Sequence, residues 1–206
     1  MLASLLGVTC TLFAGDQRPI KVARSTSKAK VLNPKDRARS VSAIRKPQVI
    51  LSAGHKATCV KLVGDKIGDL TVTDINNTKH KLDKLLSDKF TVLIFWHDNS
   101  RAGVEQFRRI PIEILAPFAK HRVKVIAANV SGDFAKTKAL TGDAADKIVS
   151  LVDADQSLFS HFAKSRVPRT YLLDKDGNIL WFDIEYSQSM QRELENALHY
   201  YLRTDS

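Results

Sequence analysis

The chain has 206 residues, with 32 Lys or Arg against 22 Asp or Glu, so its formal net charge at pH 7 is +10. Hydrophobic residues make up 44% and charged residues 26%, which excludes a wholly disordered or collagen-like chain. No apolar run reaches the ~18 residues of a spanning helix, and two cysteines, Cys10 and Cys59, are too few for a disulfide framework or a four-cysteine zinc site. We therefore expect one domain with an appendage and no integral membrane span.

The first element is an apolar stretch over residues 1–14, which is typical of the hydrophobic part of a secretory signal. We predict a signal peptide over residues 1–15, with cleavage near Ala14 or Gly15. The stretch lacks the positively charged start of such signals, so either the true start lies upstream or the export signal is weak. On this basis we expect an exported protein of the periplasm or cell envelope rather than a cytoplasmic one.

Nearly all of the net charge lies in a basic arm, which we assign to residues 16–58. From Arg18 to Lys56, eleven Lys or Arg residues face one acid, Asp36. Up to about Lys46 the arm has few large apolar residues and no aromatics, so we expect it to be flexible. A solvated tail is the simplest interpretation, and contact with a polyanion through residues 18–56 is the alternative. The apolar run Val49–Leu51 is predicted to be a strand or a local anchor.

From Val63 onward, apolar β-type runs alternate with amphipathic helical stretches. We expect five strands, at residues 91–96, 123–130, 148–152, 170–173 and 179–182. We expect helices at about residues 100–120, 157–164 and 190–202, the last one capped by Ser187 or Ser189. A right-handed crossover makes the first two strands parallel, which indicates an α/β fold with helices on both faces of the sheet.

Three ordered segments resemble parts of a known family. Residues 63–85 resemble the opening segment of redoxin domains, with a short hairpin and then a helical turn; Val92–Trp96 resembles the strand before the active-site turn; residues 166–179 resemble the cis-proline strand and its hairpin. The resemblance covers about residues 60–203 and identifies a domain, assigned to residues 59–206, of the thioredoxin-like superfamily. It is nearest to the peroxiredoxins and the exported thioredoxin-like reductases. It implies a three-layer α/β/α fold around a mixed central sheet.

The resemblance also implies where the chemistry lies. Members use one or two cysteines at the start of the first long helix, where the helix N-terminus stabilises a thiolate. Aligned on Phe95 and Trp96, these positions are Ser100 and Gly103, so both sulfurs are absent. A serine hydroxyl cannot form a disulfide. We therefore expect a binding or scaffold module without ordinary thiol–disulfide exchange.

Ser100 fits the N-cap of the long helix, or with Arg101 it would bind an anion or a substrate carbonyl. The resemblance implies a cis Val167–Pro168 bond near Ser100, and the residue before this proline offers its backbone to an extended peptide. We thus predict a groove for a protein or peptide partner, with no cofactor and no metal. Its predicted residues are Trp96, Ser100, Arg101, Val167 and Pro168.

Two other function classes stay open. An active thiol oxidoreductase or antioxidant peroxidase would need Cys59, or a partner's thiol, as its redox sulfur. Alternatively, the basic arm would dock the domain on nucleic acid or on an anionic envelope. A Ser–His–Asp relay within His97–Ser100 is disfavoured, because four consecutive residues rarely face one another. A metal site at His97 and Asp98 lacks a visible third ligand.

Overall fold

The computed structural model describes residues 45–142 and 146–204, all within one compact unit, Ala43–Ser206. The predicted signal peptide and the arm up to residue 44 lie outside the described residues. Within the described ranges, no helix combines the length and the apolar character required to cross a membrane.

A five-stranded sheet forms the centre of this unit, with the strand order β5-β4-β3-β6-β7. Its strands are β3 (Phe90–Trp96), β4 (Val123–Asn129), β5 (Ile148–Val152), β6 (Arg169–Asp174) and β7 (Ile179–Ile184). β4 runs parallel to both β3 and β5, whereas β6 is antiparallel to both β3 and β7. The five predicted strands, the parallel first pair and the mixed sheet are confirmed.

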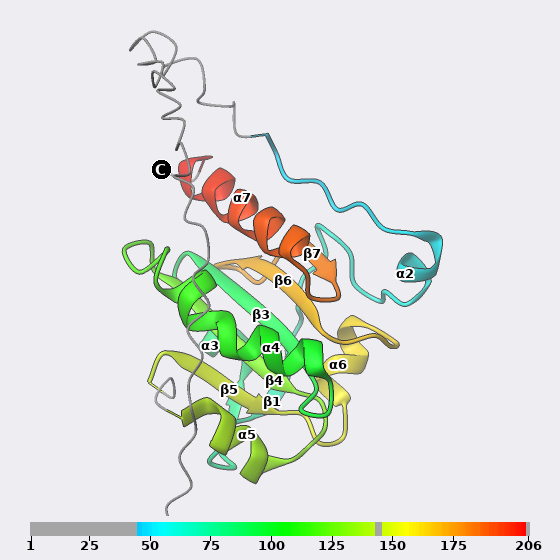
Figure 1. Ribbon diagram of the computed structural model, residues 1–206, viewed down its shortest axis with the longest axis vertical. Coiled ribbons are helices and arrows are strands. Elements are labelled where there is room, and N and C mark those ends of the chain that lie inside the picture. Colours follow the sequence, from blue (N-terminus) through cyan, green and yellow to red (C-terminus); the bar gives the residue numbers. More distant parts are fainter. Residues whose placement is uncertain (1–44, 143–145, 205–206) are drawn as a thin grey trace, which may run out of the picture. The chain divides into compact units, whose positions relative to one another are not determined.

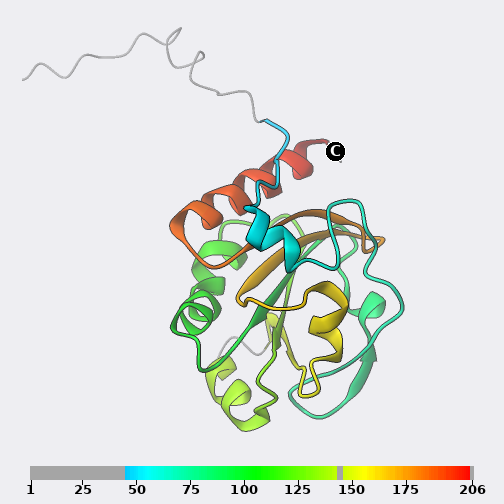
Figure 2. The same ribbon diagram turned by 90° about the vertical axis from the view of Figure 1, so that its right-hand side faces the viewer.

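Helices cover both faces of the sheet (Figure 1). They are α4 (Arg101–Ile110), its π-helical continuation η1 (Pro111–Leu115), α5 (Phe134–Thr141), α6 (Ser157–Phe162) and α7 (Gln188–Thr204). Phe107 of α4 and Leu198 of α7 share one buried cluster with Trp96, while Phe162 of α6 packs in a second cluster with Phe95. In Figure 2 the sheet lies between α4 on one side and α6 on the other. The three-layer thioredoxin-like architecture is therefore confirmed.

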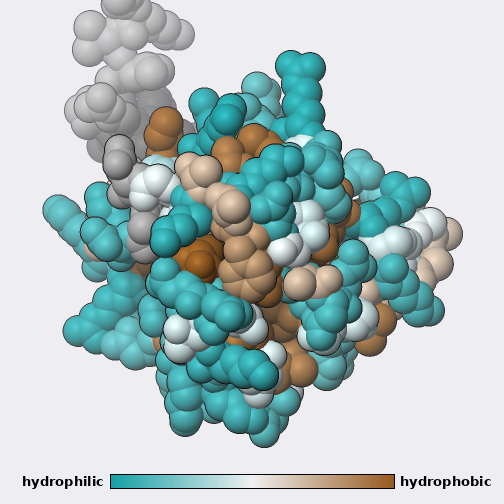
Figure 3. Space-filling model, turned by 90° about the horizontal axis from the view of Figure 1, so that it is seen from below, coloured by the Kyte–Doolittle hydropathy of each residue, from teal (hydrophilic) through white to brown (hydrophobic). Residues whose placement is uncertain are grey.

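A small hairpin precedes the main sheet. β1 (Thr71–Thr73) pairs antiparallel with β2 (Lys79–Lys81), and α3 (Leu82–Leu85) follows directly, as the resemblance of residues 63–85 implied. An isolated bridge between Asp74 and Leu151 attaches the hairpin to the free edge of β5. The face seen from below the view of Figure 1 is mostly hydrophilic, with hydrophobic residues visible between the polar ones (Figure 3).

Two helices differ from the prediction. The helix expected over residues 100–120 changes at Pro111, where the Ala116 N–H donates to the Pro111 carbonyl at 2.9 Å across a π-helical turn; proline lacks an N–H and disturbs a regular α-helix. α5 was not predicted at all. Its buried side chains are Thr137 and Thr141, so the sequence shows no apolar stripe there.

The structure also shifts the boundary between the arm and the domain. Val49 and Leu51 pack against the core, so this run is an anchor and not a strand, and α2 (Ala53–Ala57) follows it. The Lys164 N–H donates to the Thr58 carbonyl at 2.9 Å, and Cys59 forms an isolated bridge with Ala163. The predicted boundary at residue 59 therefore lies inside the packed unit, because apolar side chains in the last part of the arm dock on the domain.

Candidate functional site

The carboxyl ends of β3, β4 and β5 meet at one edge of the sheet, because these strands are parallel. The loops that follow them are joined by backbone hydrogen bonds. The Val130 N–H donates to the Trp96 carbonyl at 2.9 Å, and the Asp153 N–H donates to the Asn129 carbonyl at 2.9 Å. Ligands of α/β proteins bind at this edge, so the loops after β3 and β4 form the candidate site.

Ser100 is the N-cap of α4. Its Oγ accepts a hydrogen bond from the Gly103 N–H at 3.2 Å, and its backbone is extended, as the capping interpretation requires. Gly103 is closely packed, since a Cβ at this position would lie 3.0 Å from the His97 carbonyl oxygen and 3.1 Å from its nitrogen. The two positions that match the family's cysteines are thus occupied by a helix cap and a tight backbone contact.

An ion pair between a buried carboxylate and an exposed ammonium group holds the turn between β3 and α4. The Asp98 side chain is 2% exposed, and its Oδ2 lies 3.1 Å from the Lys136 Nζ of α5. Burial raises the pKa of Asp98, but hydrogen bonds from Lys136 and Ser131 and the charge of Lys136 outweigh it, so the pKa lies below 3.8. The Lys136 ammonium also donates to Asn99 Oδ1 at 2.9 Å. Sequence reasoning missed Lys136, because the helix that carries it was not predicted.

His97 does not form a relay with Ser100 and Asp98. Its Nδ1 accepts the Asn99 N–H at 3.0 Å, so this nitrogen carries no proton to donate to Asp98 Oδ1, 3.1 Å away. That oxygen is accordingly buried without a hydrogen-bond partner among the described residues. The same residues contain no group of three or more His, Cys, Asp or Glu side chains placed to hold a metal ion.

The predicted groove residues do not all share a surface. Trp96 is fully buried and stacks on Phe107, with ring centroids 4.5 Å apart, so it belongs to the core and has no surface for a partner. Arg101 is exposed in the first turn of α4. Val167 is half-buried and Pro168 is buried, and the predicted cis bond between them is present.

The register of β6 brings Val167 to the candidate site. Arg169 pairs with Phe95, so Val167 and Pro168 lie at the end of β3 from which the Ser100 turn leaves. The Pro168 carbonyl accepts the Glu185 N–H at 2.8 Å, whereas within the described ranges the backbone N–H and carbonyl of Val167 form no hydrogen bond. Unpaired backbone groups beside a strand end can pair with an extended peptide.

A buried arginine connects this strand to the N-terminal segment. Arg169 is fully buried; its Nη2 donates to the Ser165 carbonyl at 2.8 Å and to Thr58 Oγ1, and its Nε donates to the Arg166 carbonyl at 2.9 Å. Its Nη1 lies 3.5 Å from the Cys59 sulfur. No carboxylate of the described residues forms an ion pair with this guanidinium, although buried charges are usually paired. The contact with Arg169 places Cys59 beside a buried cation. It lies at the same end of the sheet as Ser100, because Arg169 pairs with Phe95.

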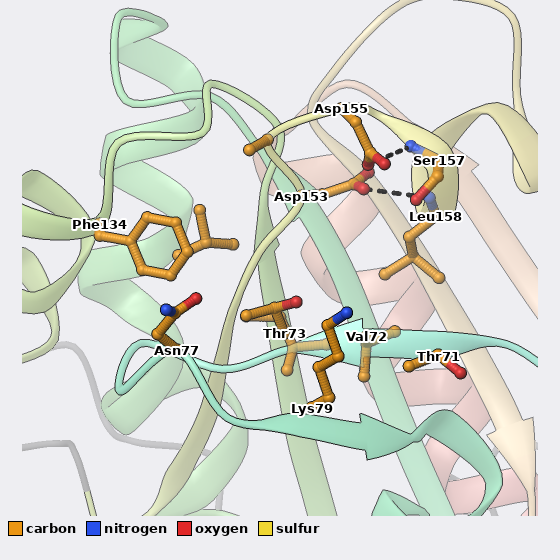
Figure 4. Close-up of a pocket in the computed structure, with 13 residues that line it drawn as sticks. Thr71, Val72, Thr73, Asn77, Lys79, Phe134, Asp153, Asp155, Ser157 and Leu158 are labelled. Carbon is orange, nitrogen blue, oxygen red and sulfur yellow. Dashed lines mark hydrogen bonds between the residues drawn. The ribbon is translucent and has the colours of Figure 1, made fainter.

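A hollow of about 450 Å³ flanks the site on the β5 side, between the hairpin and the loop after β5 (Figure 4). Asp153 accepts hydrogen bonds from the Leu158 N–H at 3.0 Å and the Phe159 N–H at 2.7 Å. Burial raises its pKa more than these bonds lower it. Asp155 also bonds the backbone at the start of α6, and the Phe134 ring points into the hollow from α5. Both carboxylates thus stabilise the start of α6 rather than a ligand.

Solved structures share this fold. A proposed protein disulfide isomerase from Bacteroides thetaiotaomicron matches with a TM-score of 0.62 and 17% identity, covering 71% of this chain and 93% of that chain. A secreted disulfide oxidoreductase from Mycobacterium tuberculosis, homologous to E. coli DsbE, matches at 0.53 and 17%, covering 64% and 96%. Peroxidoxin BcpB from Mycobacterium tuberculosis matches at 0.55 and 21%, covering 69% and 96%.

At these identities the structural matches show the fold alone. No curated protein matches the chain. The profile of the Redoxin family, however, matches residues 62–198, which include every strand of the central sheet, the Ser100 turn and the cis-proline strand. The chain therefore belongs to the Redoxin family.

Proposed function

We propose that this Redoxin-family protein binds an extended peptide at the candidate site and performs no thiol–disulfide exchange there. The proposal rests on the side chains found at the two positions that match the family's cysteines. Ser100 uses its hydroxyl as the cap of α4, and Gly103 has no side chain. Disulfide exchange requires a thiolate that attacks and a sulfur that resolves the product, and neither group is present at these positions.

The peptide-binding part of the proposal rests on Val167. Its backbone N–H and carbonyl are unpaired among the described residues, next to a proline that is held by its own bond to Glu185. A peptide in extended conformation would add main-chain hydrogen bonds at this strand end. The Asp98–Lys136 ion pair holds the neighbouring turn, so this surface is formed before a partner arrives and costs little ordering entropy on binding.

The test is an NMR titration of the full chain with an unfolded protein whose thiols are blocked, such as reduced and carboxymethylated α-lactalbumin. We expect the largest amide shift changes at Val167 and Arg101. As an internal control, the amides of Lys66 and Asn178, which pair with each other away from this edge, should not move. Shift changes confined to other surfaces, or none at millimolar probe, would contradict the proposal.

A second candidate function, a thiol oxidoreductase or peroxidase that uses Cys59, is favoured by one observation. The Arg169 guanidinium lies 3.5 Å from the Cys59 sulfur, which places the one cysteine of the described residues beside the cis-proline strand. The Cys59 thiol is half-buried and also donates to the His55 carbonyl at 3.4 Å. The sulfur is therefore near the family site but is held by the N-terminal segment rather than by α4.

An activity assay separates the two candidates. On the first proposal, the wild-type chain and Cys59→Ser should both reduce insulin disulfides and consume peroxide no faster than buffer with reductant. Ser100→Cys is the positive control for peroxide consumption, because it restores the first sulfur at the start of α4 and leaves the closely packed Gly103 unchanged. If the wild-type chain reduces insulin or consumes peroxide and Cys59→Ser abolishes this activity, the second candidate is established. The first proposal, that the protein performs no thiol chemistry, is then wrong.

We also propose that the protein acts outside the cytoplasm. The apolar stretch over residues 1–14 supports this, as does the secreted oxidoreductase among the structural neighbours. Recovery of the intact chain, with residues 1–15 uncleaved, from the cytoplasmic fraction of the native cell would refute it.

A further inference from the structure

We propose that the domain binds a small condensed phosphate, at a basic hollow on the end of the sheet opposite the candidate site. The hollow has a volume of about 470 Å³. It is lined by Lys89, Lys120, His121, Arg122, His199, Leu202 and Arg203. Six of these seven side chains are basic, and they come from three segments far apart in the sequence, so the three-dimensional fold alone brings them together.

The hollow is independent of the peptide site. Lys89 immediately precedes β3, whereas the Ser100 turn follows the other end of that strand. A strand rises about 3.3 Å per residue, so the seven residues of β3 separate the two places by roughly 20 Å. The third segment is the last turn of α7, near the chain end marked C in Figure 1.

The walls of the hollow are held in place by buried contacts. The Ser87 hydroxyl donates to the Arg122 carbonyl, which joins the turn before β3 to the turn before β4. The buried Phe118 ring contacts both imidazoles, with centroid distances of 6.3 Å to His121 and 5.1 Å to His199. These contacts hold the backbone of the two turns and the two imidazoles in place, and the exposed Lys120 and Arg203 side chains extend from this frame.

Positive charge exceeds negative charge around the hollow. Asp88 pairs with Arg122 at 2.5 Å, but both side chains are more than 60% exposed, and such pairs are weak and screened. Glu195 lies 3.8 Å from His199. Lys120 and Arg203 form no ion pair with a described residue, so these two cations are available to a bound anion. Asp205, the next acid along the chain, lies outside the described residues.

The concave shape of the hollow favours a compact soluble polyanion over the flat surface of a membrane. Clustered Lys and Arg side chains recognise phosphate oxygens by charge and by several N–H donors, and a concave site of this volume accommodates a molecule with two or three phosphate groups. A lipid headgroup carries the same phosphate chemistry, but a membrane presents it on a broad plane. We therefore assign the site to a soluble condensed phosphate, and membrane binding is an outcome that the test distinguishes.

The test is calorimetric titration of the full chain with inorganic pyrophosphate and with tripolyphosphate, at fixed ionic strength. Lys120→Gln with Arg203→Gln should weaken binding about tenfold or more, since charge-assisted hydrogen bonds are lost. The matched control is Lys66→Gln with Lys164→Gln, two exposed lysines outside the hollow. This control removes the same charge and leaves the basic arm unchanged, so it should keep the affinity within about twofold.

Equal losses in the two double variants would overturn the proposal, because general charge or the basic arm would then explain binding. No heat with either phosphate would also overturn it. A parallel sedimentation assay uses phosphatidylglycerol vesicles, with phosphatidylcholine vesicles as the neutral reference. Vesicle binding that depends on Lys120 and Arg203, together with no pyrophosphate binding, would assign the hollow to a membrane and reject the soluble ligand.

Discussion

Replacing Arg169 by alanine should lower the free energy of unfolding by about 3 kcal/mol. The guanidinium is fully buried and its donors satisfy the carbonyls of Ser165 and Arg166 and the hydroxyl of Thr58. Removing it leaves these oxygens unpaired and opens a cavity. Urea denaturation followed by circular dichroism measures the loss.

The matched control for this prediction is Arg166→Ala. Arg166 is exposed and pairs with Glu185 at 3.2 Å, with both side chains about half exposed, so its loss should cost less than about 1 kcal/mol. Arg169→Ala should also release the segment around Thr58, and alkylation of Cys59 in the native state should then become faster. Equal costs for the two variants, or unchanged Cys59 alkylation, would show that Arg169 does not hold this segment.

Lys136→Met should destabilise the domain by about 2 kcal/mol at pH 7. The substitution keeps much of the side-chain volume but removes the cation, which leaves the buried Asp98 carboxylate without its ion-pair partner. Lys138→Met is the control on the same helix. Lys138 is exposed and forms no ion pair with the described residues, so its loss should change stability by no more than about 0.5 kcal/mol.

The loss of unfolding free energy caused by Lys136→Met should become smaller as pH falls. Because the pKa of Asp98 in the folded state lies below 3.8, its ion pair contributes its full stability above that value and loses it as pH falls through the lower, folded-state pKa. The difference in unfolding free energy between wild type and variant should therefore be constant from pH 7 to about 5 and shrink below about pH 4. A difference that is independent of pH down to 3 would mean that Lys136 acts through packing and not through Asp98.

Much of the fold follows from local sequence. The run Thr91–Trp96 is rich in β-formers and is buried along its whole length, so its apolar character alone predicted a central strand. Ser100 was predicted as a helix cap because a hydroxyl before an amphipathic stretch serves this role, and its bond to the Gly103 N–H confirms the prediction. These features depend on neighbours within a few residues, which the sequence displays directly.

The missed features depend on residues that are distant in sequence. α5 buries two threonines that bond the sheet, Thr137 with Asn129 at 2.8 Å and Thr141 with Ser150 at 3.0 Å, so it lacks the apolar stripe by which a helix is detected. Lys136 was missed with it. Trp96 was assigned to a groove, but stacking on Phe107 places it in the core, because side-chain direction at the end of a buried strand is set by packing.

The net charge of +10 illustrates what the sequence determines by itself and what only the tertiary structure determines. Counting residues by segment was enough to place nearly all of the excess in residues 18–56 and to predict a nearly neutral domain. The sequence by itself also determined the fold class and the absence of sulfur at Ser100 and Gly103, because identity and spacing are local properties.

Only the tertiary structure decided what these residues contact. It placed Cys59 beside Arg169, 110 positions away, and paired Asp98 with Lys136. It also gathered basic residues from three segments of a nearly neutral domain into one hollow. Net charge sums over the chain and carries no information on position, whereas binding depends on which side chains face one another. The physical reason is that pairing of distant residues follows from strand register and helix packing, which no local pattern specifies.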